Sequence, residues 1–221
     1  QPLVVLRAPH FFLKINQQNK PSIEMVTEGG IIGKIGCNDA GIGVCLNALL
    51  TSTWGPKVPI HLGLRALLDS YTFDAALAAV NQYQMASPAH FLNASKEKKM
   101  MSVEVSPVFT GQIQPENGIL IHTNHICAPA MKNVVIDKPY DDSYQRLKVI
   151  DKLISSLTSE VKVEDIFTLL SDHANYPDSI CRHENPSKLP HENMETVFSI
   201  VMDLTSNKTS LILGNPCIMD G

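Results

Sequence analysis

The chain of 221 residues carries a net charge of −4, with 44% hydrophobic and 18% charged residues. It is long enough to bury a sizeable core, and its weak acidic charge gives no reason to expect nucleic acid as a partner. No apolar run approaches membrane-spanning length, so a membrane partner is not expected either. Five scattered cysteines favour reduced thiols in an intracellular compartment, cytoplasmic or peroxisomal, over a disulfide scaffold.

The chain opens with a predicted buried strand over residues 3–8. Residues 9–21 contain two prolines and two asparagines, which indicates a loop or a wide hairpin. A further strand begins over residues 22–26. These elements lead into the stretch that the rest of the chain is organised around, from Thr27 to Asn47.

This glycine-rich stretch holds six of the chain's twelve glycines, interleaved with β-branched residues. We expect two short strands, at about 30–36 and 41–47, joined by a turn at 38–41. Glycines in strands lower stability, which indicates that some of them permit a close approach of backbone. Neither phosphate-binding glycine motif fits. Ile35 stands where a P-loop needs serine or threonine, and the dinucleotide motif should open a helix where this pattern continues as strand.

Helical spacing of apolar residues predicts helices over 59–69 and 73–83, the second capped by Thr72. Strands follow at about 89–94, 100–106 and 118–126. The remaining predicted elements are helices over 142–157 and 163–170, then strands at about 196–204 and 209–214. Groups of strands that alternate with helix pairs favour an α+β fold with antiparallel sheets.

Two side chains stand out as candidate site residues before any resemblance is considered. An asparagine amide such as Asn124 can donate hydrogen bonds to an oxyanion, although a turn at a strand end is the simpler interpretation. Arg182 offers a rigid fork of donors for a carboxylate or an oxyanion; the alternative is a surface salt bridge with Glu184 or Asp178.

A metal site at His122, His125 and Cys127 is not expected. In the predicted strand over 118–126, side-chain alternation places His122 on one face and the other two residues on the opposite face. A tetrahedral site needs ligands that converge on one point.

The glycine-rich stretch resembles a signature of the acyl-coenzyme A:6-aminopenicillanic acid acyltransferase family, which are cysteine N-terminal-nucleophile hydrolases. Further similar motifs follow in the family's order at 121–125, 172–177, 180–183 and 214–217. The resemblance implies a single domain over residues 1–221 with the four-layer αββα sandwich of that class. It implies no cofactor and no metal.

The resemblance also assigns candidate catalytic residues. Asn124 falls on the family's oxyanion-hole asparagine and Arg182 on its active-site arginine. Cys181 precedes that arginine where relatives often carry serine, and Ser106 lies near the family's other active-site serine.

The family's nucleophile is a cysteine that self-cleavage exposes as a new N-terminus. We expect it upstream of residues 3–8, outside this sequence, because Cys37 and Cys45 lie on internal strands without a free α-amine. The implied activity is acyl transfer or amide hydrolysis through an acyl-cysteine intermediate. The implied partners are a small acyl amide or acyl-coenzyme A and the protein's own cleaved N-terminal fragment. The alternative is an inactive relative that keeps the fold as a binding module.

Overall fold

The computed structural model describes residues 10–82, 84–157 and 160–218. The chain forms two compact units. The first, here called the sheet unit, comprises Arg7–Tyr140 and Asp203–Lys208; the second, the hairpin unit, comprises Gln1–Leu6, Asp141–Met202 and Thr209–Gly221. The predicted strand at 3–8 lies outside the described residues, and the single domain over 1–221 stays a prediction.

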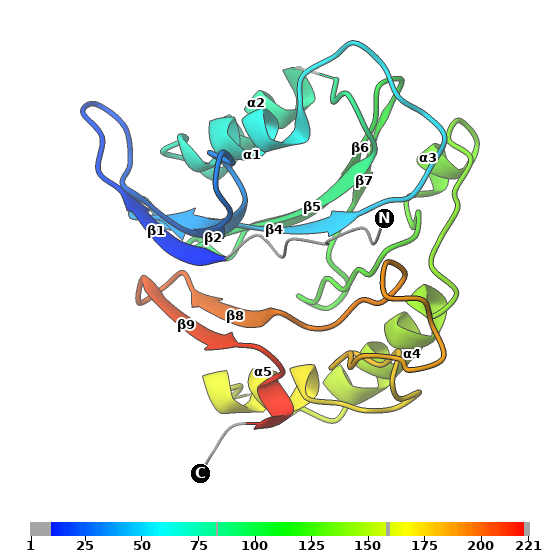
Figure 1. Cartoon of the computed structure of the whole chain (residues 1–221). Coiled ribbons are helices and arrows are strands. Elements are labelled where there is room, and N and C mark those ends of the chain that lie inside the picture. Colours follow the sequence, from blue (N-terminus) through cyan, green and yellow to red (C-terminus); the bar gives the residue numbers. More distant parts are fainter. Residues whose placement is uncertain (1–9, 83, 158–159, 219–221) are drawn as a thin grey trace. The chain divides into compact units, whose positions relative to one another are not determined.

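The sheet unit is built on a seven-stranded antiparallel sheet in which every strand pairs with the next one along the chain (Figure 1). Antiparallel pairing permits this order, because each strand can reverse into its neighbour. The connection from β4 to β5 is the longest and contains two helices. The strands are β1 Phe11–Ile15, β2 Ile23–Thr27, β3 Ile35–Asn38, β4 Ile42–Ala48, β5 Ala89–Ser95, β6 Met100–Val105 and β7 Thr110–Ile113.

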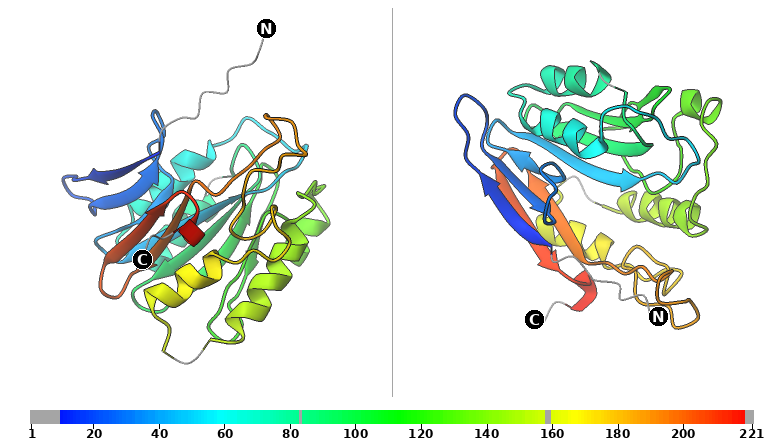
Figure 2. Two further views of the ribbon diagram at one scale, coloured as in Figure 1. Left: turned by 60° about the horizontal axis from the view of Figure 1, so that its bottom comes forward. Right: turned by 45° about the horizontal axis from the view of Figure 1, so that its top comes forward.

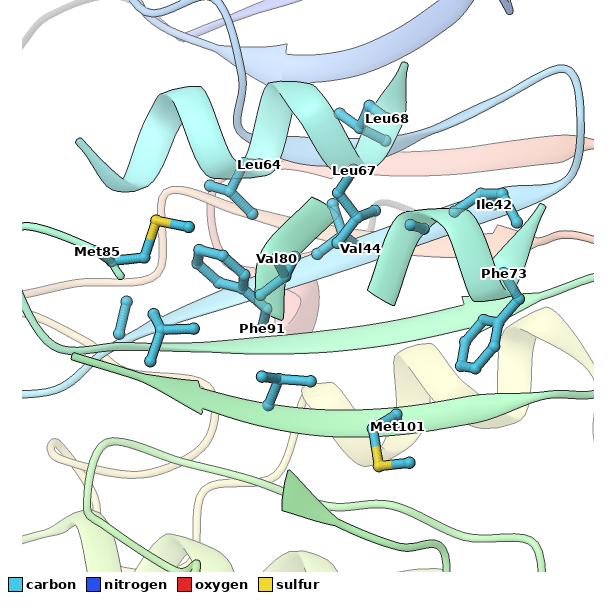
Figure 3. Packing of buried hydrophobic residues seen from close by; sticks show 14 of the residues in the cluster. Ile42, Val44, Leu64, Leu67, Leu68, Phe73, Val80, Met85, Phe91 and Met101 are labelled. Atoms are coloured by element: carbon cyan, nitrogen blue, oxygen red, sulfur yellow. The ribbon is translucent and has the colours of Figure 1, made fainter. Parts of the chain in front are cut away.

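Helices α1 (Ile60–Leu68) and α2 (Phe73–Gln82) cover one face of this sheet (Figure 2, right). Figure 3 shows Leu64 and Leu67 of α1 packed over Val44 and Phe91 of the sheet. Alternation along β5 and β6 sends apolar side chains such as Phe91 into this core and their neighbours to the opposite face. That opposite face carries the polar residues described below.

Two glycines of the glycine-rich stretch are explained by close backbone contacts inside the sheet unit. A Cβ atom at Gly33 would collide with the backbone of α1 at His61 and Arg65, and one at Gly36 would collide with β2 at Glu24. Gly41 has a φ of 86° in the turn, where its backbone N–H donates to the carbonyl oxygen of Asn38 at 3.0 Å. The expected turn at 38–41 is confirmed, whereas the strand before it begins at Ile35 instead of residue 30.

The hairpin unit contains two helices that pack on each other, α4 (Ser143–Ile154) and α5 (Val163–Leu170). They lie side by side in the left view of Figure 2. The strands β8 (Phe198–Asp203) and β9 (Lys208–Leu213) form a two-stranded sheet. The turn between them, Asp203–Lys208, belongs to the sheet unit. A 3₁₀ turn, η1 (Pro216–Ile218), follows β9. Among the described residues, no helix is long and apolar enough to cross a membrane.

One predicted strand is wrong. Residues 120–128 contain neither strand nor helix, because the backbone N–H groups of Ile126, Cys127 and Ala128 donate to the side chains of Asp137 and Glu104 instead of to a neighbouring strand. The wide hairpin expected as one alternative over residues 9–21 is present as β1 paired with β2. Prediction missed β7 and the short helix α3 (Pro129–Lys132). Strands this short give little periodicity to detect.

Candidate functional site

Three strands of the sheet unit bring a row of polar side chains together on the face opposite α1 and α2. In the strand register His90 lies between Asn47 of β4 and Glu104 of β6. Nδ1 of His90 is 2.9 Å from Oδ1 of Asn47, and its Nε2 is 2.5 Å from the hydroxyl oxygen of Ser102. A neutral ring satisfies both contacts by donating to the amide oxygen and accepting from the hydroxyl.

The ring of His122 stacks on that of His90, with ring centroids 3.4 Å apart. Burial, together with the neighbouring His122, lowers the pKa of His90 well below 6.5. Nδ1 of His122 donates to the carbonyl oxygen of Thr123 at 2.7 Å, and its Nε2 is 2.9 Å from Oε1 of Glu104. In this stack the neutral ring of His90 therefore lies against the ring of His122, which contacts the buried carboxylate of Glu104.

Glu104 is fully buried and anchors the loop that follows His122. Its Oε1 accepts from the backbone N–H of Cys127 at 2.6 Å, and its Oε2 accepts from that of Ala128 at 3.1 Å. Gly111, the residue of β7 opposite Glu104, permits this approach, because a Cβ atom there would be only 2.7 Å from the Cβ of Ala128. The carboxylate of Glu104 thus binds the loop at both ends. It contacts the side chain of His122 at the start and the backbone N–H groups of Cys127 and Ala128 at the end.

Asn124 lies within this anchored loop, between His122 and Cys127. Its Nδ2 donates to the carbonyl oxygen of Ala48, the last residue of β4, at 3.0 Å. The loop and the end of β4 together fix the orientation of the amide, a requirement for a donor that is to meet an oxyanion.

The hydroxyl of Ser106 is hydrogen-bonded to the backbone of the turn that follows it. Its hydroxyl donates to the carbonyl oxygen of Phe109 at 2.7 Å and accepts from the backbone N–H groups of Phe109 at 3.0 Å and Val108 at 3.3 Å. These contacts close the turn between β6 and β7. A catalytic role for Ser106 would require this turn to open.

Arg182 lies in the hairpin unit and is almost fully buried. Its Nη2 donates to Oδ2 of Asp142, which also accepts from Nε of Arg146. Nε of Arg182 is 3.9 Å from Oδ1 of Asp178. Burial alone would raise the pKa of Asp178, but hydrogen bonds from Lys188 and Asn185 and the charges of Lys188 and Arg182 lower it. The expected pairing of Arg182 with Asp178 is therefore present, as the longer contact of a largely buried ion-pair network whose shorter contact is with Asp142.

Cys181 precedes Arg182 in the sequence and is fully buried. Its thiol contacts His183 and Asn215 instead of the ion-pair network of Arg182. Its Sγ is 3.6 Å from Nε2 of His183 and 3.5 Å from Nδ2 of Asn215. Asn124 and Ser106 thus belong to the sheet unit, and Cys181 and Arg182 to the hairpin unit. A shared catalytic role of the four residues stays a prediction.

Two groups among the described residues have the side chains to hold a metal ion: Glu104 with His122 and Cys127, and His173 with Cys181, His183 and Cys217. Strand alternation predicted that His122 and Cys127 lie on opposite faces. This expectation is wrong, because both residues contact Oε1 of Glu104. Its carboxylate oxygens are already bound to N–H donors. Burial and the charge of Glu104 raise the pKa of Cys127 to about 11.

A scan of known families identifies the relationship. The model for acyl-coenzyme A:6-aminopenicillanic acid acyl-transferase matches residues 8–217. The chain belongs to this family. It is 35% identical over 207 residues to the 40 kDa form of acyl-coenzyme A:6-aminopenicillanic-acid-acyltransferase of Emericella nidulans. The match covers 92% of this chain and 56% of that protein, so the chain spans little more than half the length of this curated relative.

The solved structures of two other proteins are similar in fold to the present chain. An N-acylethanolamine-hydrolyzing acid amidase ortholog of Caenorhabditis elegans has a TM-score of 0.53 at 13% identity, covering 96% of this chain and 82% of its own. A single-residue variant of conjugated bile acid hydrolase from Clostridium perfringens has a TM-score of 0.60 at 12% identity, covering 96% and 85%. These similarities confirm the α+β fold of N-terminal-nucleophile hydrolases.

Sequence reasoning missed Glu104. In the strand Met-Met-Ser-Val-Glu-Val it occupies a polar position of a regular alternation, which predicts an exposed side chain. The only available signal is its register opposite His90, and register is set by the tertiary pairing of β5 with β6.

Proposed function

We propose that this chain is the scaffold and polar shell of an enzyme that transfers or hydrolyses acyl groups through an acyl-cysteine intermediate. The nucleophile is the cysteine of an N-terminus created by self-cleavage, upstream of residues 1–221. The observation that carries the proposal is the family match over residues 8–217.

In the proposed reaction the cysteine thiolate attacks the carbonyl carbon of an amide or acyl thioester, and a carbon–sulfur bond forms. Collapse of the tetrahedral intermediate breaks the bond to the amine or thiol, which leaves with a proton from the α-amino group. Water or an acceptor amine then attacks the acyl-cysteine, and the thiol is regenerated. The name of the Emericella nidulans relative supports acyl-coenzyme A as the donor.

Two residues receive roles in this reaction. Asn124 donates from its amide to the oxyanion, a role supported by the loop that Glu104 anchors. Arg182 orients the polar end of the substrate, either directly or through the carboxylates of its ion-pair network. The five scattered cysteines, all of them free thiols, support an intracellular location for the enzyme.

The experiment uses the full-length protein with its upstream segment. Incubation with an acyl-coenzyme A and with a chromogenic acyl amide, followed by intact mass spectrometry, should reveal self-cleavage and an acyl adduct on the new N-terminal cysteine. Asn124→Ala should lower kcat about 10²–10³-fold, the usual effect of losing one oxyanion donor. Asn81→Ala, at an exposed position of α2, is the matched control and should keep full activity.

The alternative, a non-enzymatic binding module, makes a different prediction. Full-length protein would then bind acyl compounds reversibly and form no covalent adduct, and Asn124→Ala would change only the affinity. Cysteine-dependent turnover that requires Cys37, Cys45 or Cys181 would show that the nucleophile has been placed wrongly.

A further inference from the structure

Four metal-binding side chains of the hairpin unit converge on one point. His173 follows α5, Cys181 and His183 lie in the loop after it, and Cys217 lies in η1. One ligand atom from each residue lies within 4.8 Å of the ligand atom of every other. The residues come from two segments separated by more than thirty positions, so the convergence is a property of the fold.

Hydrogen bonding cannot account for all the contacts of His183 at once. Nε2 of His183 is 2.9 Å from Nε2 of His173, 3.6 Å from Sγ of Cys181 and 3.4 Å from Sγ of Cys217. A ring nitrogen carries either one proton or one lone pair, so it makes one well-directed hydrogen bond. A cation at the centre of the cluster would satisfy all four atoms at once.

We propose that His173, Cys181, His183 and Cys217 bind one Zn²⁺ ion in a closed tetrahedral site. Zinc–nitrogen bonds of about 2.0–2.1 Å and zinc–sulfur bonds of about 2.3 Å place tetrahedral ligand atoms about 3.3–3.8 Å apart. The observed separations around His183 differ from this range by at most a few tenths of an ångström. Two thiolates and two imidazoles also form a donor set that favours zinc over the hard cations Mg²⁺ and Ca²⁺.

Surrounding hydrogen bonds hold the ligands in place. The backbone N–H of Cys181 donates to the carbonyl oxygen of Asp172, and that of His183 to the carbonyl oxygen of Pro177, both at 3.0 Å. Asn215 donates from Nδ2 to Sγ of Cys181 at 3.5 Å and to the carbonyl oxygen of Arg182 at 2.7 Å. A donor aimed at a metal-bound sulfur is the usual outer shell of such a site.

With four protein ligands the site has no open position for substrate, so its role is structural. It ties η1 to the loop 173–183 and fixes the backbone on both sides of Arg182. The proposal does not depend on the proposed acyl-transfer function. It departs from the expectation of a metal-free protein that the family resemblance implied.

The test measures metal content of the full chain, purified without a histidine tag and exposed to Zn²⁺ alone before desalting. About one zinc per chain is expected by inductively coupled plasma mass spectrometry, falling below about one-tenth in Cys217→Ala and His173→Gln. Cys45→Ala and His191→Gln remove one thiol and one exposed imidazole outside the cluster, and both should retain about one zinc.

Cobalt supplies a second readout, which starts from the wild-type chain. The wild-type chain loaded with Co²⁺ alone should show the intense visible bands of tetrahedral cobalt and a near-ultraviolet sulfur-to-cobalt band. Cys217→His keeps a fourth ligand, so it should retain cobalt while the sulfur-to-cobalt band falls to about half. Substoichiometric zinc in the wild type, equal zinc in ligand and control variants, or a Cys181–Cys217 disulfide found by non-reducing peptide mapping would each overturn the proposal.

Discussion

Oε1 of Glu104 lies 2.9 Å from Nε2 of His122, and neither side chain is exposed by more than 1%. The same carboxylate accepts from the backbone N–H groups of Cys127 and Ala128. Glu104 is therefore a positioning residue for the loop that carries Asn124, although it is not itself a candidate to touch substrate.

Glu104→Gln should destabilise the protein. Glutamine keeps the shape but replaces one oxygen with an NH₂ group, so at least one buried N–H donor loses its acceptor. The expected loss is about 1–3 kcal/mol in the free energy of unfolding, measured by urea denaturation. Glu97→Gln, in the exposed turn between β5 and β6, should change it by less than about 0.5 kcal/mol. Equal losses in both variants would contradict the anchoring role.

Gly33→Val should also destabilise the protein, because the new side chain would collide with the backbone of α1 at His61 and Arg65. Overpacking of this kind costs about 1–3 kcal/mol. A Cβ at Gly29 meets nothing within 4 Å, so Gly29→Ala is the control and should leave the thermal midpoint nearly unchanged. A Gly33→Val variant as stable as wild type would refute the packing explanation for this glycine.

Stability should fall as the solution is acidified below about pH 6.5. The unfolded chain binds a proton at His90 near that pH, whereas burial and His122 lower the pKa of the folded residue well below it. The unfolded state then holds more protons between the two values, so the free energy of unfolding decreases with falling pH. His90→Gln should reduce this slope, measured by urea titrations from pH 7 to pH 5. An unchanged slope would assign the dependence to His10 and His125, whose pKa values burial also lowers.

Cys45 and Cys127 should resist alkylation in the folded protein. Burial raises the pKa of each thiol to about 11, with smaller contributions from Cys37 at the first and Glu104 at the second. At pH 8 about one molecule in a thousand then carries the thiolate, against about a quarter for an unperturbed cysteine. Timed labelling with iodoacetamide and peptide mass spectrometry would measure this, with the urea-unfolded chain as control. Rapid labelling of Cys127 in the native state would contradict it.

Asp142→Asn should be the most destabilising of these substitutions. The carboxylate accepts from both Arg146 and Arg182, and Arg182 is almost fully buried. Loss of this carboxylate leaves the guanidinium of Arg182 with only its longer contact to Asp178, at 3.9 Å. Breaking a buried pair costs about 3–5 kcal/mol. Asp74 pairs with Lys99 at 3.0 Å on the surface, and Asp74→Asn should cost about 1 kcal/mol or less. Comparable midpoints for the two variants in urea would show that the network around Arg182 is dispensable.

The sequence by itself determined the elements whose signal is local. Apolar spacing located α1, α2, α4 and α5, and α5 has the predicted bounds, Val163–Leu170. Alternation located β5 and β6, and the glycine motifs led to the family that the comparisons confirmed. A helix face or a strand pleat is recorded in residues a few positions apart, so these elements could be predicted without the fold.

Only the tertiary structure decided which polar side chains meet. Glu104 looks exposed in its strand, yet the pairing of β5 with β6 and the close approach at Gly111 bury it beneath the Asn124 loop. His173 and Cys217 are distant in sequence and have no zinc-finger spacing, yet they share a cluster. Such contacts depend on how segments far apart in the chain pack together, and periodicity within one segment carries no record of that.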